Sequence, residues 1–142
     1  MMKIQSEVVP QVEFILNYNF MKPDICWEAL QGKGAGGFPH GNKRLALVGD
    51  VLLRLKHIRD WFPTSSSPEV GTNIASGLGT NAHLAMRGRQ AGLDRFINPN
   101  PSQKGAVNDG LVADTVEALI GAVEMDGGSW ALDEVMKRLG VL

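Results

Sequence analysis

The chain has 142 residues, of which 44% are hydrophobic and 20% are charged, a composition that excludes a disordered chain and fits one globular domain with a core. Fourteen basic residues against fifteen acidic ones give a net charge of −1, which argues against tight, unaided binding of nucleic acid but not against transient contact. The single cysteine, Cys26, excludes an internal disulfide framework and fits a reducing compartment, and no stretch has the length and apolarity of a secretory signal or a membrane span.

Apolar residues at helical spacing predict three helices in the first half of the chain. The first covers residues 8–18, and Phe14 is among its apolar positions. A short helix follows, for which Asp24 is a suitable cap. Residues 31–41 contain five glycines and are therefore predicted to form a loop, without the spacing of a Walker phosphate loop. Asn42 is a candidate N-cap for the third helix, which runs to about residue 60.

The third helix carries polar side chains between apolar ones. We expect its apolar residues to form the buried side: Val48, Val51, Leu52, Leu55 and Ile58. Lys43, Ala46, Asp50 and His57 fall at spacings that place them together on one face. A carboxylate among apolar neighbours is costly without a partner, so a cation, a donor or water must satisfy Asp50. His57 is expected to be a surface histidine.

The second half of the chain predicts further helices and no strands. Residues 71–79 form at best a weak helix because of their glycines, and Thr80 or Asn81 is expected to cap the next helix. A turn-rich loop covers 97–105, and a long helix then begins at residue 107 or 108. Gly127 and Gly128 stop that helix, and Ser129 is expected to cap a last one that carries Trp130. The prediction is one all-α domain, 1–142, of six or seven helices.

The long helix carries two acids near its centre. Asp114 and Glu117 lie three residues apart and therefore share a face. They lie opposite an apolar stripe: Val112, Val116, Leu119, Ile120 and Val123. Two interpretations remain open on spacing alone. The acids belong to a solvated outer face, or they form half of a divalent-metal site, which needs hard oxygen ligands on a rigid support.

Two segments are similar to the signatures of a known family. Residues 112–123, Val-Ala-Asp-Thr-Val-Glu-Ala-Leu-Ile-Gly-Ala-Val, resemble the second signature of the ribonuclease III endonuclease domain. Residues 42–50, Asn-Lys-Arg-Leu-Ala-Leu-Val-Gly-Asp, resemble the first, which usually reads Asn-Glu-Arg-Leu-Glu-Phe-Leu-Gly-Asp. The segments lie in the family's order, and weaker similarity extends from about Val12 to Leu139.

The resemblance implies a helical ribonuclease III-like fold and a metal-dependent endoribonuclease that cuts double-stranded RNA to 5′-phosphate and 3′-hydroxyl ends. Asp50, Asp114 and Glu117 would be its catalytic residues and would bind Mg²⁺ or Mn²⁺. A homodimer is also implied, because a duplex needs one active centre per strand. No double-stranded-RNA-binding domain is expected before the end at Leu142. We expect an intracellular, cytoplasmic protein, with the mitochondrion and the nucleus left open.

The resemblance also shows departures. The family usually has a glutamate at Ala46 and an acid at Lys43, so this site loses up to two negative charges and gains a positive one, which should weaken metal binding. Lys43 has two options, to turn into solvent or to replace a metal ion by pairing with Asp50. Leu47 stands where the family has a bulky aromatic residue, so the dimer is expected to be looser or differently packed.

Two principal hypotheses follow from these departures. One is an endoribonuclease of reduced activity. The other is a catalytically degenerate, RNA-binding or ribosome-associated structural protein. A third hypothesis, a helical protein that merely shares the fold, predicts binding of neither metal nor duplex.

Overall fold

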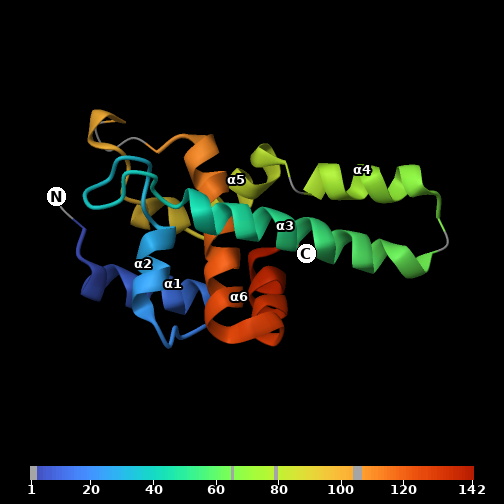
Figure 1. The fold of residues 1–142 in the computed structure, drawn as a ribbon, viewed down its shortest axis with the longest axis horizontal. Coiled ribbons are helices and arrows are strands. Elements are labelled where there is room, and N and C mark those ends of the chain that lie inside the picture. The colour runs from blue at the N-terminus through green and yellow to red at the C-terminus, as the bar shows by residue number, and fades with distance from the viewer. Residues whose placement is uncertain (1–2, 65, 79, 104–106) are drawn as a thin grey trace.

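The computed structural model describes residues 3–64, 66–78, 80–103 and 107–142, and predictions that fall on the other positions lie outside it. The elements are α1 (Gln5–Leu16), α2 (Pro23–Ala29), α3 (Lys43–Trp61), η1 (Phe62–Thr64), α4 (Pro68–Leu78), α5 (Asn81–Gln90), η2 (Leu93–Phe96), η3 (Pro101–Gln103) and α6 (Asp109–Leu139) (Figure 1). Over these ranges no strand forms, and two isolated bridges join residues 31 to 98 and 35 to 38. The all-α prediction is confirmed. Along the described residues, no helix combines the length and the apolarity that crossing a membrane requires.

Helix α6 runs through the centre of the molecule. Nearly every residue from 112 to 123 is buried, so this segment is covered by other helices on all its sides. Gly128 has φ 80° and ψ −175°, which interrupts the helix where the glycine pair predicted an end. Beyond that break, Ser129 donates its hydroxyl to Glu124 at 3.2 Å, and Trp130 is 82% exposed.

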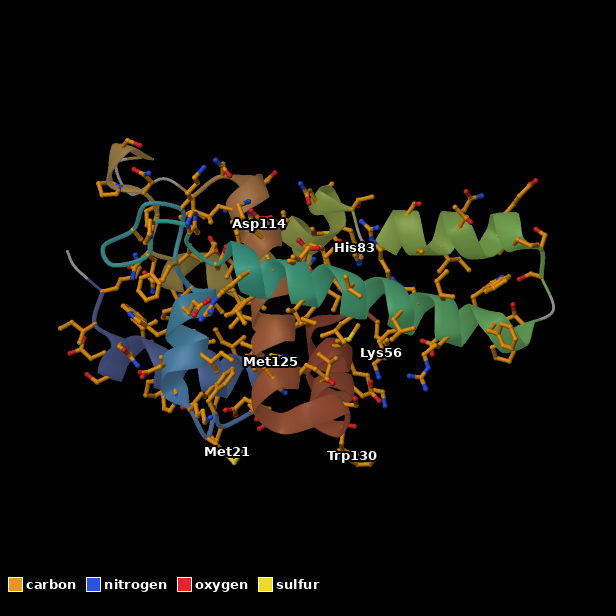
Figure 2. All side chains as sticks on the ribbon, in the orientation of Figure 1. Met21, Lys56, His83, Asp114, Met125 and Trp130 are labelled. Carbon is orange, nitrogen blue, oxygen red and sulfur yellow. The ribbon has the colours of Figure 1, made fainter. Side chains whose placement is uncertain are left out.

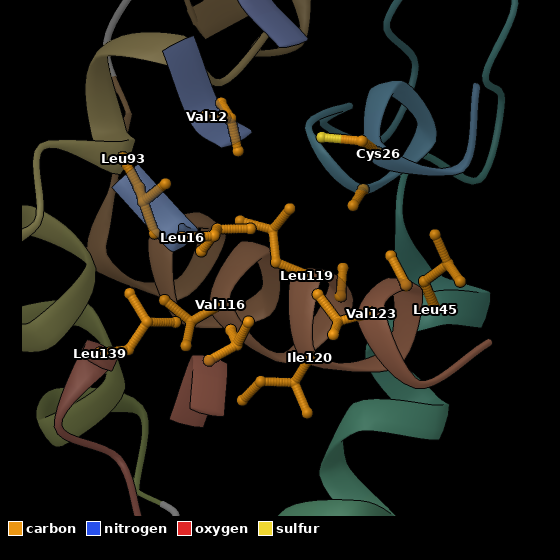
Figure 3. Packing of buried hydrophobic residues seen from close by; sticks show 14 of the residues in the cluster. Val12, Leu16, Cys26, Leu45, Leu93, Val116, Leu119, Ile120, Val123 and Leu139 are labelled. Carbon is orange, nitrogen blue, oxygen red and sulfur yellow. The ribbon is translucent and has the colours of Figure 1, made fainter. Parts of the chain in front are cut away.

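The core lies between α6 and the helices around it (Figure 3). The side chains that meet there come from most parts of the chain: Val12 and Leu16 of α1, Cys26 of α2, Leu45 of α3, Leu93 of η2, and Val116, Leu119, Ile120, Val123 and Leu139 of α6. Such burial of apolar surface is the main favourable contribution to folding. It holds α6 rigidly against α3, which fixes where the acidic side chains of the two helices lie.

Helices α3 and α6 cross with their backbones in contact, because each has a glycine at the crossing. A Cβ at Gly49 would lie 1.7 Å from the carbonyl oxygen of Glu117, and one at Gly121 would lie 2.4 Å from the carbonyl oxygen of Leu45. No larger residue fits either position without moving a helix. The crossing therefore places the middle of the first signature directly against the second.

The orientation of α3 differs from the prediction. Its exposed side carries three large apolar residues, Leu47 (68% exposed), Val51 (59%) and Leu55 (47%). Its buried residues are Leu45, Ala46, Gly49, Leu53 and His57. His57 is thus not a surface residue, and its Nε2 lies 2.8 Å from the carbonyl oxygen of Val141. The prediction failed because α3 is apolar on more than one side, so periodicity could not choose between them.

Local predictions elsewhere are confirmed in part. Thr80 caps α5 by accepting from the N–H of His83 at 3.3 Å, and Asn108 caps α6 by accepting from that of Leu111 at 2.9 Å. Residues 68–78 form a helix of eleven residues, α4, where only a weak one was expected. Phe14, one of the apolar positions that predicted the first helix, is exposed. Helix α4 runs back along the far half of α3, and both project away from the body that surrounds α6 (Figure 1).

Candidate active site

The glycine crossing brings Asp50 of α3 against Glu117 of α6. Their carboxyl groups lie within hydrogen-bonding distance of each other, although the residues are far apart in the sequence. Glu117 is only 8% exposed, and Asp50 is half-buried. For Glu117, the interpretation of a solvated outer face is therefore wrong. Two acids at such a distance need a shared proton or a cation between them.

The surroundings of Glu117 raise its pKa to about 8. Burial has the largest effect, followed by the hydrogen bond with Asp50 and the negative charges of Asp50 and Asp114, while the guanidinium of Arg54 acts in the opposite direction. At neutral pH this pair therefore keeps a proton when no cation is present.

Two basic side chains form ion pairs with acids of the site, one with Asp50 and one with Asp114. Arg54, one turn beyond Asp50 on α3, places its Nη2 3.2 Å from the Asp50 Oδ2. Lys43, at the start of α3, forms an ion pair with the Asp114 carboxylate. The sequence suggested that Lys43 either turns into solvent or pairs with Asp50. It does neither, because its partner is Asp114. Asp114 lies where α3 passes α6 (Figure 2).

The three predicted acids thus differ in what their carboxyl groups contact. Asp50 and Glu117 face each other, whereas the carboxylate of Asp114 is held by Lys43. Among the residues that the structure describes, no three His, Cys, Asp or Glu side chains are grouped so that they could hold one metal ion. The donor set fits a hard divalent ion on two carboxylates, which is enough for Mg²⁺, an ion that usually keeps several waters. Ala46, the other altered position, is buried on the same helix.

A cavity of about 550 Å³ opens beside Asp114. Its walls come from the glycine-rich loop, the first turn of α3, the loop before η3 and the first turns of α6. The polar side chains that line it are basic, amide or hydroxyl groups apart from Asp114: Lys33, Asn42, Lys43, Asn100, Ser102 and Asn108. Cations and amide donors are the groups that bind phosphate oxygens in nucleic-acid complexes.

Sequence reasoning missed the roles of two residues here. Asn42 does occupy the N-cap position of α3, but its buried side chain donates to the carbonyl oxygen of Ala29 at 2.9 Å and to the Thr115 hydroxyl at 3.1 Å, which ties α2 and α6 to the start of α3. The sequence did not single out Arg54 as a partner of Asp50. Its spacing of four residues from Asp50 on one helix was the signal that would have paired them.

Much of the remaining basic charge is already paired. Arg44 makes two hydrogen bonds to Glu28, Lys56 pairs with Asp133, and Arg89 pairs with Asp94 and Asp109. These side chains are therefore paired surface charges, whereas the cavity brings Lys33 and Lys43 beside Asp114 of the second signature.

The fold is that of a known nuclease domain. The nuclease domain of ribonuclease III from Campylobacter jejuni superposes with a TM-score of 0.84 over 92% of this chain and 95% of its own, at 21% sequence identity. A second structure of that domain gives 0.77 at 20% identity. The first is described as flexible in a region involved in dimer formation. At these identities the likeness establishes the fold.

Sequence comparison points to the same family. Ribonuclease 3 of Wolinella succinogenes is 29% identical over 139 residues, which are 94% of this chain and 58% of that protein. Ribonuclease 3 of Actinobacillus pleuropneumoniae is 29% identical over 119 residues, 80% of this chain and 52% of that protein. The chain spans about half the length of these relatives. No protein-family model matches it. The resemblance to the ribonuclease III endonuclease domain is confirmed by fold and by sequence together.

Proposed function

We propose that this chain, as one domain over 1–142, is a metal-dependent endoribonuclease of the ribonuclease III type that cleaves double-stranded RNA with reduced activity. The observation that carries the proposal is the contact between Asp50 and Glu117 at the glycine crossing of the two signature helices. A buried pair of acids on two rigid helices is costly to a fold unless it has a function. The similarity to proteins named Ribonuclease 3 supplies the reaction.

In this proposal Asp50 and Glu117 hold a divalent ion, Mg²⁺ or Mn²⁺. Such an ion lowers the pKa of bound water and neutralises the charge that develops at phosphorus. The chain's own groups do the rest. Arg54 holds the Asp50 carboxylate in place, and the burial of Glu117 keeps bulk water from its carboxyl group. The basic and amide side chains of the cavity bind backbone phosphates beside Asp114.

Cleavage of a long RNA duplex in Mg²⁺ tests this function. Glu117→Gln is expected to reduce the products to background, because the amide removes a charge that the divalent ion needs. Glu134→Gln is the matched control, since it makes the same chemical change on the exposed part of α6, and it should cleave like the wild type. Background-level products from both the wild type and Glu117→Gln, in Mg²⁺ and in Mn²⁺, would contradict the enzyme.

The exposed apolar residues of α3 support a homodimer. Leu47, Val51 and Leu55 are spaced four apart on one side of α3, and exposed Val70 and Ile74 lie on the adjacent α4. A stripe of this kind on the surface is typical of an interface. The nuclease domain from Campylobacter jejuni is described as having a region involved in dimer formation, which supports a dimer of this chain.

Sedimentation velocity tests the dimer. Val51→Asp should give a monomer, because a charge in the centre of an apolar interface is strongly unfavourable. Phe14→Asp puts the same charge on an exposed apolar residue of α1 and should leave the dimer intact. A wild-type chain that sediments as a monomer at all concentrations would contradict the interface.

The second candidate is a degenerate domain that binds RNA or a ribosomal partner without cutting. The ion pair between Lys43 and Asp114 favours it, because it removes one carboxylate from the site. This candidate predicts that the wild type and Glu117→Gln bind the duplex equally and that neither produces fragments. Loss of cleavage in Glu117→Gln, with binding retained, would exclude it.

A further inference from the structure

The ion pair of Lys43 affects how many metal ions the candidate site can hold. Its ammonium group forms an ion pair with Asp114, whose side chain is 23% exposed, and both residues line the cavity of about 550 Å³. The carboxylate of Asp114 therefore already has a cation. The carboxyl groups of Asp50 and Glu117, in contrast, face each other. The site thus consists of one satisfied acid and one pair of acids without enough positive charge.

The other basic groups nearby do not take this role. Arg54 pairs with Asp50 from the solvent side and has a side chain that is 68% exposed. Lys33 lines the same cavity from the glycine-rich loop. Lys43 is the residue whose charge is placed directly on an acid of the second signature. An ammonium group is a compact cation that binds a carboxylate oxygen as a metal ion does, but it cannot carry a water nucleophile.

We propose that the ammonium of Lys43 takes the place of a divalent ion at Asp114, so that the chain binds a single divalent ion, on Asp50 and Glu117. This inference rests on the proposed function for the identity of that ion. Sites that activate phosphodiesters often hold two metal ions. Here the second position carries a permanent cation that no chelator removes, and Asp114 acts as the group that positions Lys43 and not as a metal ligand.

Titration of Mn²⁺ into the full chain, followed by calorimetry and by the electron paramagnetic resonance of free Mn²⁺, tests the inference without measuring activity. The wild type should bind one equivalent. Lys43→Gln frees Asp114 and should tighten Mn²⁺ binding about tenfold, the size of a nearby unit charge after screening, or add a second equivalent. Lys43→Arg keeps the cation and should bind like the wild type.

The decisive comparison removes Asp114 in two backgrounds. Asp114→Asn should weaken Mn²⁺ binding less than about threefold in the wild type, because Lys43 already occupies that carboxylate and can turn to solvent once released. In Lys43→Gln the same change should cost about tenfold or more, because Asp114 is then a ligand. Lys33→Gln removes a charge from the same cavity without touching Asp114 and should change binding less than about twofold.

Equal losses from Asp114→Asn in both backgrounds would overturn the inference, as would the absence of Mn²⁺ binding in every variant. Binding by Lys43→Gln alone would also overturn it, since the wild type would then hold no divalent ion on Asp50 and Glu117. The outcome is separate from that of the proposed function. Glu117-dependent cleavage without this coupling would retain the nuclease and reject the role of Lys43, and coupling without cleavage would do the reverse.

Discussion

The contact between the α3 and α6 backbones makes Gly49→Ala the most direct test of how the fold builds the acid pair. A Cβ at residue 49 would lie 1.7 Å from the carbonyl oxygen of Glu117 and 2.5 Å from its carbonyl carbon. Since carbon and oxygen approach to about 3.3 Å at closest, the helices must separate by roughly 1.5 Å. Both atoms belong to the backbone, so no change of rotamer relieves the overlap.

The free energy of unfolding should fall accordingly. Overpacking a well-filled core costs about 1–3 kcal/mol and sometimes more, and here a helix displacement would also loosen the core around α6. We therefore expect a loss of about 3 kcal/mol or more, equivalent to a melting temperature lower by roughly 10 °C for a chain of this size. Thermal unfolding followed by circular dichroism at 222 nm measures it.

Gly77→Ala is the matched control, because Gly77 also lies in a helix, α4, and a Cβ there would meet nothing within 4 Å. Alanine is favoured over glycine in a helix by up to about 1 kcal/mol, so this variant should melt at or above the wild-type temperature. If Gly49→Ala has the same melting temperature as Gly77→Ala, the helices do not touch at this crossing. The proposed position of Asp50 beside Glu117 then loses its structural basis.

Three further outcomes are expected. Asp126→Ala should cost about 2 kcal/mol in urea unfolding at pH 7, because its carboxylate accepts from the Tyr18 hydroxyl at 2.6 Å and from two N–H groups of the α1–α2 loop. Desolvation raises the pKa of Asp126, but these hydrogen bonds outweigh it and lower the pKa. The stability that they contribute is therefore present above about pH 4 and is lost as the pH falls through the folded-state pKa. An equal cost of the substitution at pH 7 and pH 2 would contradict this. Cys26 should resist a thiol reagent until the chain unfolds, since burial, followed by nearby carboxylates, raises its pKa to about 12, and rapid labelling of the folded chain would refute it. His57→Ala should lower the unfolding free energy by about 2 kcal/mol, because the buried ring packs in the core and bonds to the C-terminal backbone, whereas exposed His40→Ala should change it by less than about 0.5 kcal/mol.

Features that depend on local backbone chemistry could be predicted from the sequence. Thr80 and Asn108 cap helices because their side-chain oxygens satisfy N–H groups that every helix leaves open, whatever the rest of the fold does. Gly128 interrupts α6 because it takes a backbone conformation that other residues avoid. The resemblance added the nuclease-domain fold, which periodicity could not have supplied.

Burial of α3 could not be predicted because it depends on what surrounds the helix. Val51 and Leu55 are as apolar as Leu45 and Leu53, yet the first two are exposed and the last two are buried. The better signal was Gly49, because a glycine within a helix is unfavourable unless another backbone approaches it closely. That signal selects the correct face, and it places His57, two turns further on, in the core.

Residue spacing limits which acid can pair with Lys43. Lys43 and Asp50 are seven residues apart, about 10.5 Å along a helix axis, and helical side chains tilt toward the N-terminus, so Lys43 is poorly directed toward Asp50. Helix geometry therefore disfavours a pairing with Asp50, and the partner comes from another helix. Helix α6 offers two acids three residues apart, about 4.5 Å along its axis. Once Glu117 lies against Asp50 at the glycine crossing, Asp114 is the acid left for Lys43. The charge that remains uncompensated then belongs to Asp50 and Glu117, which is why a divalent ion is expected at that pair.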